Sequence, residues 1–385
     1  MLNGSAKLTI DFGNSQTRMV LSMGSKHDTK CLPNVFTQVS EDYEIPENYK
    51  SLMEEPSYLF KVHGLGEGTY IGGLVASREA RAANIKPSAL QPKYRSISTI
   101  LSMNLVMYEA YQSLSRLFHT KIDQIDVTWD VVVLLPPVDM ANKAAMIEHV
   151  SQVTEIDFTE PEACFDVKYD SIKVLPEGLS AFFAVLFDKN KNIRKEFKDF
   201  GDKSVLVLDI GAGTTDLAVI EDYQVIDSTR DTIRIGGNNL YQKISRALRE
   251  RDIVLSESRV QQGIFDGYVQ DGSVQHDIVD LIDKFTLEVA QSMTSAIRSS
   301  FDNNMYNPRD ISYLLVVGGG AISGKGHHQI AEELCKYMKE LSPNISVVKI
   351  PQVSKKVTDE DGKTSTIKEP LDIRMLNLIG ANLVS

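Results

Sequence analysis

The chain has 385 residues, of which 42% are hydrophobic and 24% charged, and its formal net charge is −11. This composition is typical of a globular protein and excludes a disordered chain, a collagen, a coiled coil and a disulfide scaffold, while the length favours two domains. The acidic charge argues against direct binding to the phosphate backbone of DNA, which requires a concentrated basic face.

The cysteine and hydropathy patterns favour a cytoplasmic protein. Cys31, Cys164 and Cys335 are far apart and include no C-x-x-C pair, so neither a zinc site nor a disulfide framework is indicated. The N-terminal residues lack the apolar core of a secretory signal, and no stretch approaches about 18 uninterrupted apolar residues. We therefore expect no association with a membrane.

Taken in chain order, the pattern alternates between strands and helices, which indicates an α/β fold. The first clear element, 8–21, predicts two strands joined by a turn at 12–15. The apolar runs 127–135 and 313–317 are typical of strands buried on both faces. We expect short strands in a loop-rich region at 34–75, helices over 96–119, 142–153, 179–187, 235–249, from 258, and over 278–301, 328–341 and 376–383, and an exposed hairpin or loop over 352–369.

A second copy of the first element occurs at 206–219, 198 residues further along the chain. Both copies consist of a strand ending in Asp-apolar-Gly, a small polar loop and a second strand. The matched residues are Leu8 and Leu206, Asp11 and Asp209, Gly13 and Gly211, and Thr17 and Thr215. A repeat at about half the chain length indicates two related domains.

Each copy has the chemistry of a phosphate-binding turn. Such a turn needs backbone N–H groups facing the anion, and glycine supplies both clearance and the freedom to adopt positive φ. A carboxylate at the strand end can hold hydrated Mg2+. The residues that fit are Asp11, Gly13, Asn14, Ser15 and Arg18 in the first copy, and Asp209, Gly211, Ala212, Gly213, Thr214 and Thr215 in the second. The alternative, an ordinary tight hairpin, is the better interpretation of one such turn, but not of two at this spacing.

Five segments resemble, in order, those of the actin, sugar-kinase and heat-shock ATPase superfamily. They are the first phosphate loop Asp11–Arg18, the first connecting segment Leu175–Ala181, the second phosphate loop Asp209–Asp216, the adenosine loop Leu315–Gly320 and the second connecting segment at Gly380. Within this superfamily, residues 131–136, 142–143, 176–177 and 318–321 resemble the ParM/StbA-like plasmid segregation actins. That family usually has Lys where this chain has Arg18, which keeps the charge but changes the geometry.

The resemblance implies an actin-like α/β fold, with two duplicated ribonuclease-H-like domains around a nucleotide cleft. It places the first domain at 1–175 with an inserted subdomain at about 34–95. The second domain is expected at 176–370 with an inserted subdomain at about 237–300, and 371–385 returns to the first domain.

The resemblance also implies the site residues. Asp11 and Asp209 would hold Mg2+ through water, and Glu177 would orient the attacking water, so these three are the expected catalytic residues. The expected contacts to ATP or ADP are Gly13, Asn14, Ser15, Gln16, Arg18, Gly211, Ala212, Gly213, Thr214, Thr215, Gly236, Gly237, Gly318, Gly319 and Gly320. Taken alone, Glu177 would be better interpreted as a helix-start carboxylate.

Three other patterns are interpreted as ordinary structural features and not as binding sites. Residues 319–325 match the start of a G-x-x-x-x-G-K-[ST] phosphate loop, but Gly326 replaces the hydroxyl residue, so we expect Lys325 to be a solvated helix-start residue. The adjacent pair His327 and His328 is interpreted as surface polar. The glycines of 64–68 favour a hairpin over a dinucleotide site.

The resemblance implies an ATPase that polymerises with Mg-ATP into dynamic filaments, which hydrolysis destabilises. Such filaments would segregate plasmid DNA through a DNA-binding adaptor protein bound to a centromere-like site, and the partner in the filament is the chain itself. GTP in place of ATP stays open. The alternatives are a small-molecule kinase of the same superfamily, and a cell-shape or chaperone-type ATPase.

Overall fold

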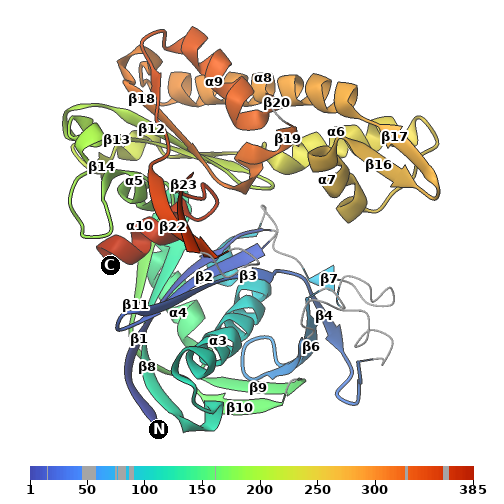
Figure 1. Cartoon of the computed structure of the whole chain (residues 1–385), viewed down its shortest axis with the longest axis vertical. Coiled ribbons are helices and arrows are strands. Elements are labelled where there is room, and N and C mark those ends of the chain that lie inside the picture. Colours follow the sequence, from blue (N-terminus) through green and yellow to red (C-terminus); the bar gives the residue numbers. More distant parts are fainter. Residues whose placement is uncertain are drawn as a thin grey trace. The chain divides into compact units, whose positions relative to one another are not determined.

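The computed structural model describes residues 1–14, 16–45, 58–73, 76, 84–85, 91–160, 162–325, 328–358 and 364–385. These residues divide into two compact units (Figure 1). Unit 1 comprises Met1–Leu135, Asp139–Pro176 and Val384–Ser385, and unit 2 comprises Pro136–Val138 and Glu177–Leu383. The passage from one unit to the other after Pro176 lies one residue beyond the expected end of the first domain.

The main sheet of unit 1 has the strand order β11-β8-β1-β2-β3. β1 (Leu2–Phe12) runs antiparallel to β2 (Gln16–Met23) and parallel to β8 (Ile125–Leu135). β11 (Lys168–Pro176) continues the parallel part beside β8, and β3 (Lys26–Pro33) continues the antiparallel part beside β2. The first predicted element is therefore confirmed as the β1–β2 hairpin.

A long helix, α3 (Ile97–Phe118), supplies much of the core of unit 1. Side chains alternate across a strand, so Leu8 and Ile10 of β1 and Val131 and Val133 of β8 join α3 in this core. Val132 and Leu134 of β8 are buried as well. The prediction of a strand buried on both faces is confirmed for Val131–Leu135, whereas Thr128 near the start of the predicted run is exposed.

The main sheet of unit 2 has the corresponding order β14-β13-β12-β18-β21. β12 (Val205–Ile210) runs antiparallel to β13 (Thr215–Glu221) and parallel to β18 (Tyr313–Val317), and β18 is parallel to β21 (Ser346–Val347). β14 (Gln224–Val225) continues from β13.

The register of the two hairpins is also the same. Phe12 pairs with Thr17 and Ile210 with Thr215, each pair 198 residues from its counterpart. The expected duplication of a ribonuclease-H-like mixed sheet is therefore confirmed.

Helices cover both faces of the unit 2 sheet. Leu206 and Leu208 of β12 pack in one core with α8 (Val279–Asn303) and α9 (Ile330–Leu341). Val205 and Val207 point to the opposite face and pack in a second core with α5 (Leu179–Leu186) and α10 (Leu376–Val384). A residue at an odd position of β12, including Asp209, therefore belongs to the face that carries α5 and α10.

The remaining elements extend the two units. Unit 1 has α4 (Lys143–Ser151) and a second sheet in the order β10-β9-β5-β6-β4-β7, formed by β4 (Phe36–Val39), β5 (Tyr58–Val62), β6 (Gly68–Gly72), β7 (Asn84–Ile85), β9 (Glu155–Glu160) and β10 (Ala163–Asp166). Unit 2 has β15 (Asp231–Ile233), α6 (Gly237–Arg249), α7 (Glu257–Asp266), and three hairpins: β16 (Tyr268–Asp271) with β17 (Val274–Asp277), β19 (Gly324–Lys325) with β20 (His328–Gln329), and β22 (Gln352–Thr358) with β23 (Thr364–Pro370).

Most expected elements are present within two residues of their predicted ends, including the hairpin at 352–369, whose residues 359–363 lie outside the described part. The turn at 64–68 joins β5 and β6, as expected for a hairpin. The pairing of β9 with β5 was not foreseen, and it adds residues 155–166 to the inserted sheet expected at 34–95. Within the described part of the chain, no helix combines the length and the hydropathy that a membrane span requires.

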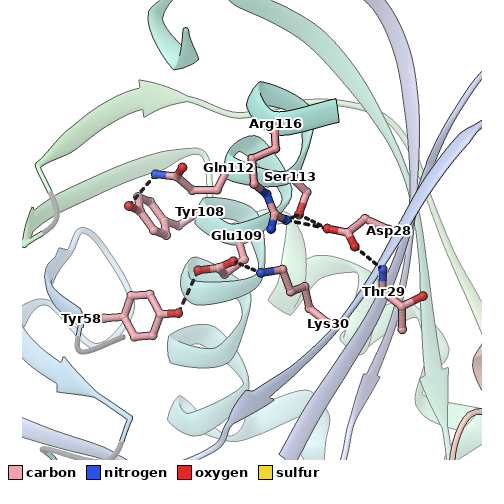
Figure 2. A network of polar contacts seen from close by, with 9 residues as sticks. All are labelled: Asp28, Thr29, Lys30, Tyr58, Tyr108, Glu109, Gln112, Ser113 and Arg116. Atoms are coloured by element: carbon pink, nitrogen blue, oxygen red, sulfur yellow. Dashed lines mark hydrogen bonds and ion pairs between the residues drawn. The ribbon is translucent and has the colours of Figure 1, made fainter. Parts of the chain in front are cut away.

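A polar network joins α3 to β3 and to the inserted sheet (Figure 2). The buried Glu109 carboxylate lies 3.2 Å from Lys30 Nζ and accepts a hydrogen bond of 2.8 Å from the Tyr58 hydroxyl. Further along the same helix, Arg116 forms an ion pair of 2.7 Å with Asp28. Loss of one partner of a buried charge is costly, so the Glu109 contacts fix α3 against two sheets at once.

α10 packs against α5 backbone to backbone. A Cβ atom on Gly380 would overlap the carbonyl oxygen of Ser180 and lie 2.9 Å from the amide nitrogen of Ala184. This packing explains why α10 belongs to unit 2 as far as Leu383. Of the segment 371–385, which is expected to return to the first domain, Val384 and Ser385 are grouped with unit 1.

We predict that Gly380→Ala destabilises the protein by about 1–3 kcal/mol, the usual cost of overpacking, although alanine is the better helix former by about 1 kcal/mol. The midpoint of urea unfolding measures the loss. Gly272→Ala in the β16–β17 turn shows the cost of backbone strain without overpacking, about 1–2 kcal/mol, because a Cβ there meets nothing within 4 Å while φ is +58°. Unchanged or increased stability in Gly380→Ala would contradict the close packing of α10 on α5.

Candidate functional site

Two segments of unit 2, the start of α6 and the loop after β18, converge on the loop between β12 and β13. The loop is closed by a hydrogen bond of 2.8 Å from the Gly211 N–H to the Thr214 carbonyl. The first turn of α6 docks on it, because the N–H groups of Gly237 and Asn238 donate to the carbonyls of Gly211 and Ala212 at 3.0 and 2.7 Å. These two N–H groups are thus engaged by protein, and the helix holds the loop in place.

Glycines make this convergence sterically feasible. A Cβ on Gly236 would lie 2.6 Å from the carbonyl oxygen of Ala212. A Cβ on Gly320 would overlap the carbonyl oxygen of Gly211. A Cβ on Gly318, which has φ +92°, would overlap Oδ1 of Asp209. The expected second phosphate loop, the Gly236–Gly237 pair and the expected adenosine loop therefore lie together, at backbone contact distance.

Glycine is needed in the two phosphate-type turns for clearance and not for positive φ. Neither Gly13 nor Gly211 has a left-handed φ, which corrects that part of the expectation. At Gly13 a Cβ would lie 2.6 Å from the carbonyl oxygen of Gln16. Thr215 is fully buried and its hydroxyl donates to the Ile235 carbonyl at 2.7 Å, so this hydroxyl supports the loop.

The two acidic residues expected in unit 2 are near each other in the fold. Asp209 ends β12 on the face of α5, and Glu177, which is 6% exposed, directly precedes the Gly178 cap of α5. Asn377 of α10 links the two segments: its Nδ2 donates to Oδ2 of Asp209, and its Oδ1 accepts from the Gly178 N–H at 2.9 Å. Sequence reasoning missed Asn377. Its position one helical turn before Gly380 was the available signal.

In unit 1, the expected site residues lie on one hairpin. Asp11 and Arg18 are cross-strand partners, and Arg18 Nη1 lies 3.7 Å from Oδ2 of the buried Asp11. Arg18 therefore neutralises Asp11 instead of extending alone toward an anion. The Gly13 carbonyl accepts a bond of 2.7 Å from Asn34, whose own Oδ1 accepts one of 2.5 Å from Ser102 of α3.

A small open pocket of about 10 Å³ adjoins this hairpin. Most of the residues that line it have polar side chains; they are Phe12, Asn14, Asn34, Gln91, Lys93, Ser96, Ser98 and Thr99. Near Lys93, burial raises the pKa of the Asp139 carboxyl while the lysine charge opposes that rise. Asn14 thus lies at an accessible cavity, and Ser15 lies outside the described residues.

Residues 319–325 do not form the alternative phosphate loop. Gly324 and Lys325 belong to β19, which pairs with β20, and α9 begins only at Ile330. A phosphate loop of that type leads from its Gly-Lys directly into a helix. The expectation that Lys325 starts a helix is therefore wrong, and of the histidine pair His328 lies in β20 while His327 is outside the described residues.

Among the described residues, no group of three or more His, Cys, Asp or Glu side chains could hold a metal ion. The expected mode, in which Asp11 and Asp209 hold Mg2+ through water, does not require such a group, since a hydrated ion needs few carboxylates. Asp11 belongs to unit 1 and Asp209 to unit 2. The roles of all these residues in binding and catalysis stay predictions.

Comparisons with known proteins identify the fold. A family model described as the C-terminal part of the archaeal actin homologue MreB-like family matches residues 207–327. Among solved structures, the actin-like protein Alp7A is 18% identical with a TM-score of 0.70, over 100% of this chain and 96% of its own. No curated protein matches the chain.

Two other solved structures match over similar lengths. The archaeal actin homologue Ta0583 in complex with ADP is 14% identical with a TM-score of 0.66, over 98% of this chain and 97% of its own. A ParM from Clostridium botulinum in a 15-stranded filament is 14% identical with a TM-score of 0.65, over 98% of both chains. These likenesses show an actin-like fold, so the expected fold class is confirmed.

We predict that Gly320→Ala weakens nucleotide binding about tenfold or more. The added Cβ would push the loop after β18 away from Gly211, and an overpacking cost of about 1–3 kcal/mol corresponds to roughly that factor. A fluorescent ATP analogue titrated against each variant measures the dissociation constant. Gly272→Ala serves as the control, and unchanged affinity in Gly320→Ala would contradict a role of this contact in binding.

Proposed function

We propose that the protein is an ATPase that binds Mg-ATP and polymerises into filaments of its own chain. One observation carries the proposal: in unit 2, three segments expected to bind nucleotide meet around the carbonyls of Gly211 and Ala212. A pair of ordinary hairpins would not require helix α6 and the loop after β18 to approach this turn at glycine-only distances.

The residues present fit a nucleotide with Mg2+. At the glycine positions 236, 318 and 320 the space of a side chain is taken by backbone of the second phosphate loop and by Asp209, so the three segments expected to bind nucleotide are held close together. Asp209 and Asp11 end equivalent strands, and carboxylates at such positions suit a hydrated hard cation. When bound, Mg2+ would neutralise charge on the phosphate oxygens of ATP.

The residues of the chain would then act mainly by positioning. Phosphoryl transfer to water requires little covalent chemistry from the protein. The Gly211–Thr214 loop would orient the phosphates, and Glu177 would orient the attacking water and accept its proton. Glu177 is buried at the start of α5. This burial supports the catalytic role better than it supports the alternative, a solvated helix-start carboxylate.

The proposal extends to plasmid segregation through a DNA-binding adaptor protein. The similarity to Alp7A and to a filament-forming ParM supports self-assembly of this chain, and the ADP complex of Ta0583 supports adenine nucleotide binding. The net charge of −11 favours an adaptor over direct contact with DNA. Hydrolysis would weaken the contacts between subunits.

We predict that the wild-type protein sediments with Mg-ATP and releases phosphate. Glu177→Gln should still sediment, but its rate of phosphate release should fall about 100-fold or more, since loss of a general base costs about that factor or more. Pelleting and phosphate release are measured on the same samples. Glu332→Gln is the matched control, because Glu332 is an exposed carboxylate in the first turn of α9.

The outcomes separate the alternatives. Equal phosphate release by the two glutamine variants would leave Glu177 as a helix-start carboxylate only. If nothing sediments over a wide concentration range and ATP is consumed only with an added small acceptor, the filament proposal fails and the kinase alternative replaces it.

A further inference from the structure

Asn377, at the second position of α10, joins two parts of unit 2 that are far apart in the sequence. Its Nδ2 donates to Oδ2 of Asp209 at the end of β12, and its Oδ1 accepts from the Gly178 N–H at 2.9 Å. The residue is only 7% exposed. Neither the sequence motifs nor the comparisons with known proteins assign it a role.

The Asn377 amide satisfies both partners at once, through two different atoms. The Asp209 carboxylate can only accept and the Gly178 N–H can only donate, so the residue between them must offer one donor and one acceptor. Aspartate at 377 would place two carboxylates in contact, and alanine would leave a buried N–H without this acceptor. The two partners also fix which end of the amide faces which group.

The backbone around Asn377 holds this geometry. Gly380, one turn further along α10, brings the helix onto the backbone of α5 at Ser180. α5 itself begins directly after Gly178. The φ of Gly178 is +72°, a backbone conformation that residues with a side chain rarely adopt. The start of α10 and the start of α5 are thus fixed together, with Asn377 at the polar end of the contact.

The second carboxylate oxygen of Asp209, Oδ1, lies against a different segment of unit 2, the loop after β18. Oδ1 lies beside the Cα of Gly318, where a Cβ would overlap it. Asn377 therefore anchors Oδ2, while the absence of a side chain at Gly318 lets backbone pack beside Oδ1. One side chain also fixes the peptide that follows Glu177, because the Gly178 N–H belongs to that peptide.

We propose that Asn377 is a positioning residue, which orients Asp209 toward hydrated Mg2+ and holds the Glu177–Gly178 peptide in place for the attacking water. This inference rests on the function proposed above. It assigns one amide to both the metal-holding and the water-orienting parts of unit 2, so its loss must affect both.

The test compares Asn377→Ala with wild type in two measurements. A fluorescent ATP analogue is titrated with Mg2+ and again with excess EDTA, and phosphate release is followed against Mg2+ concentration. Loss of a group that orients a metal-holding side chain typically costs about 10- to 100-fold in metal affinity. We expect a rise of about that size in the Mg2+ needed for half-maximal release, a fall in kcat, and affinity in EDTA within about twofold of wild type.

A charge swap separates positioning from folding. In the double variant Asp209→Asn/Asn377→Asp, the carboxylate at position 377 can accept from both the amide introduced at position 209 and the Gly178 N–H, so all hydrogen bonds are restored with the charge moved. We expect the double variant to melt at a higher temperature than Asn377→Asp alone. Adding Mg2+ should not raise its affinity for the ATP analogue, as it does for wild type. Asn382→Ala, on the same helix, controls for loss of an asparagine from α10.

Each outcome supports or overturns the inference. A wild-type Mg2+ requirement and kcat in Asn377→Ala would overturn it. Equal losses of affinity with Mg2+ and with EDTA, matched by a lower melting temperature, would make Asn377 merely structural and overturn it as well. If wild-type protein binds no Mg-ATP, the proposed function itself fails, and that result is visible before any variant is measured.

Discussion

The architecture of unit 2 depends on backbone packing directly against backbone around the carbonyls of Gly211 and Ala212. Helix α6 donates two N–H groups to these carbonyls, and the loop after β18 approaches them so closely that a Cβ at Gly320 would overlap. Close packing of this kind tolerates no added methyl group without rearrangement. It leaves a surface of main-chain groups and small side chains, which is what recognition of phosphate requires.

The same sheet gives this surface its charged groups by strand alternation. Odd positions of β12 face α5 and α10, so Asp209 follows Val205 and Val207 onto the face where Glu177 and Asn377 lie. In unit 1 the equivalent carboxylate, Asp11, is partnered across the hairpin by Arg18. The duplicated sheets therefore carry equivalent acidic residues in different surroundings, one bound by an amide and the other by a guanidinium.

The local parts of this structure could be predicted from sequence because their signals are local. The Asp-x-Gly repeat specified both hairpins with their register, and the helical spacing of apolar residues specified α3, α8 and α10. The Asp11–Arg18 pair also follows from the hairpin register and could have been found.

Contacts that depend on tertiary packing had no such signal. β9 joins β5 because Phe158 stacks on Phe60 and Tyr108, which no pattern within 155–166 reveals. Asn377 is one of two asparagines in α10, and although its position one turn before Gly380 marks it, its partners become apparent only once Gly380 has set the distance between α10 and α5.

Hydrogen exchange read by mass spectrometry, with and without Mg2+ and a slowly hydrolysed ATP analogue, tests the central claim most directly. The account predicts slowed exchange in peptides that contain 11–18, 209–216 and 318–323, because bound phosphate and adenosine would engage or cover their amides. Unchanged exchange in 209–216 and 318–323 at saturating nucleotide, or slowed exchange confined to other segments, would contradict it.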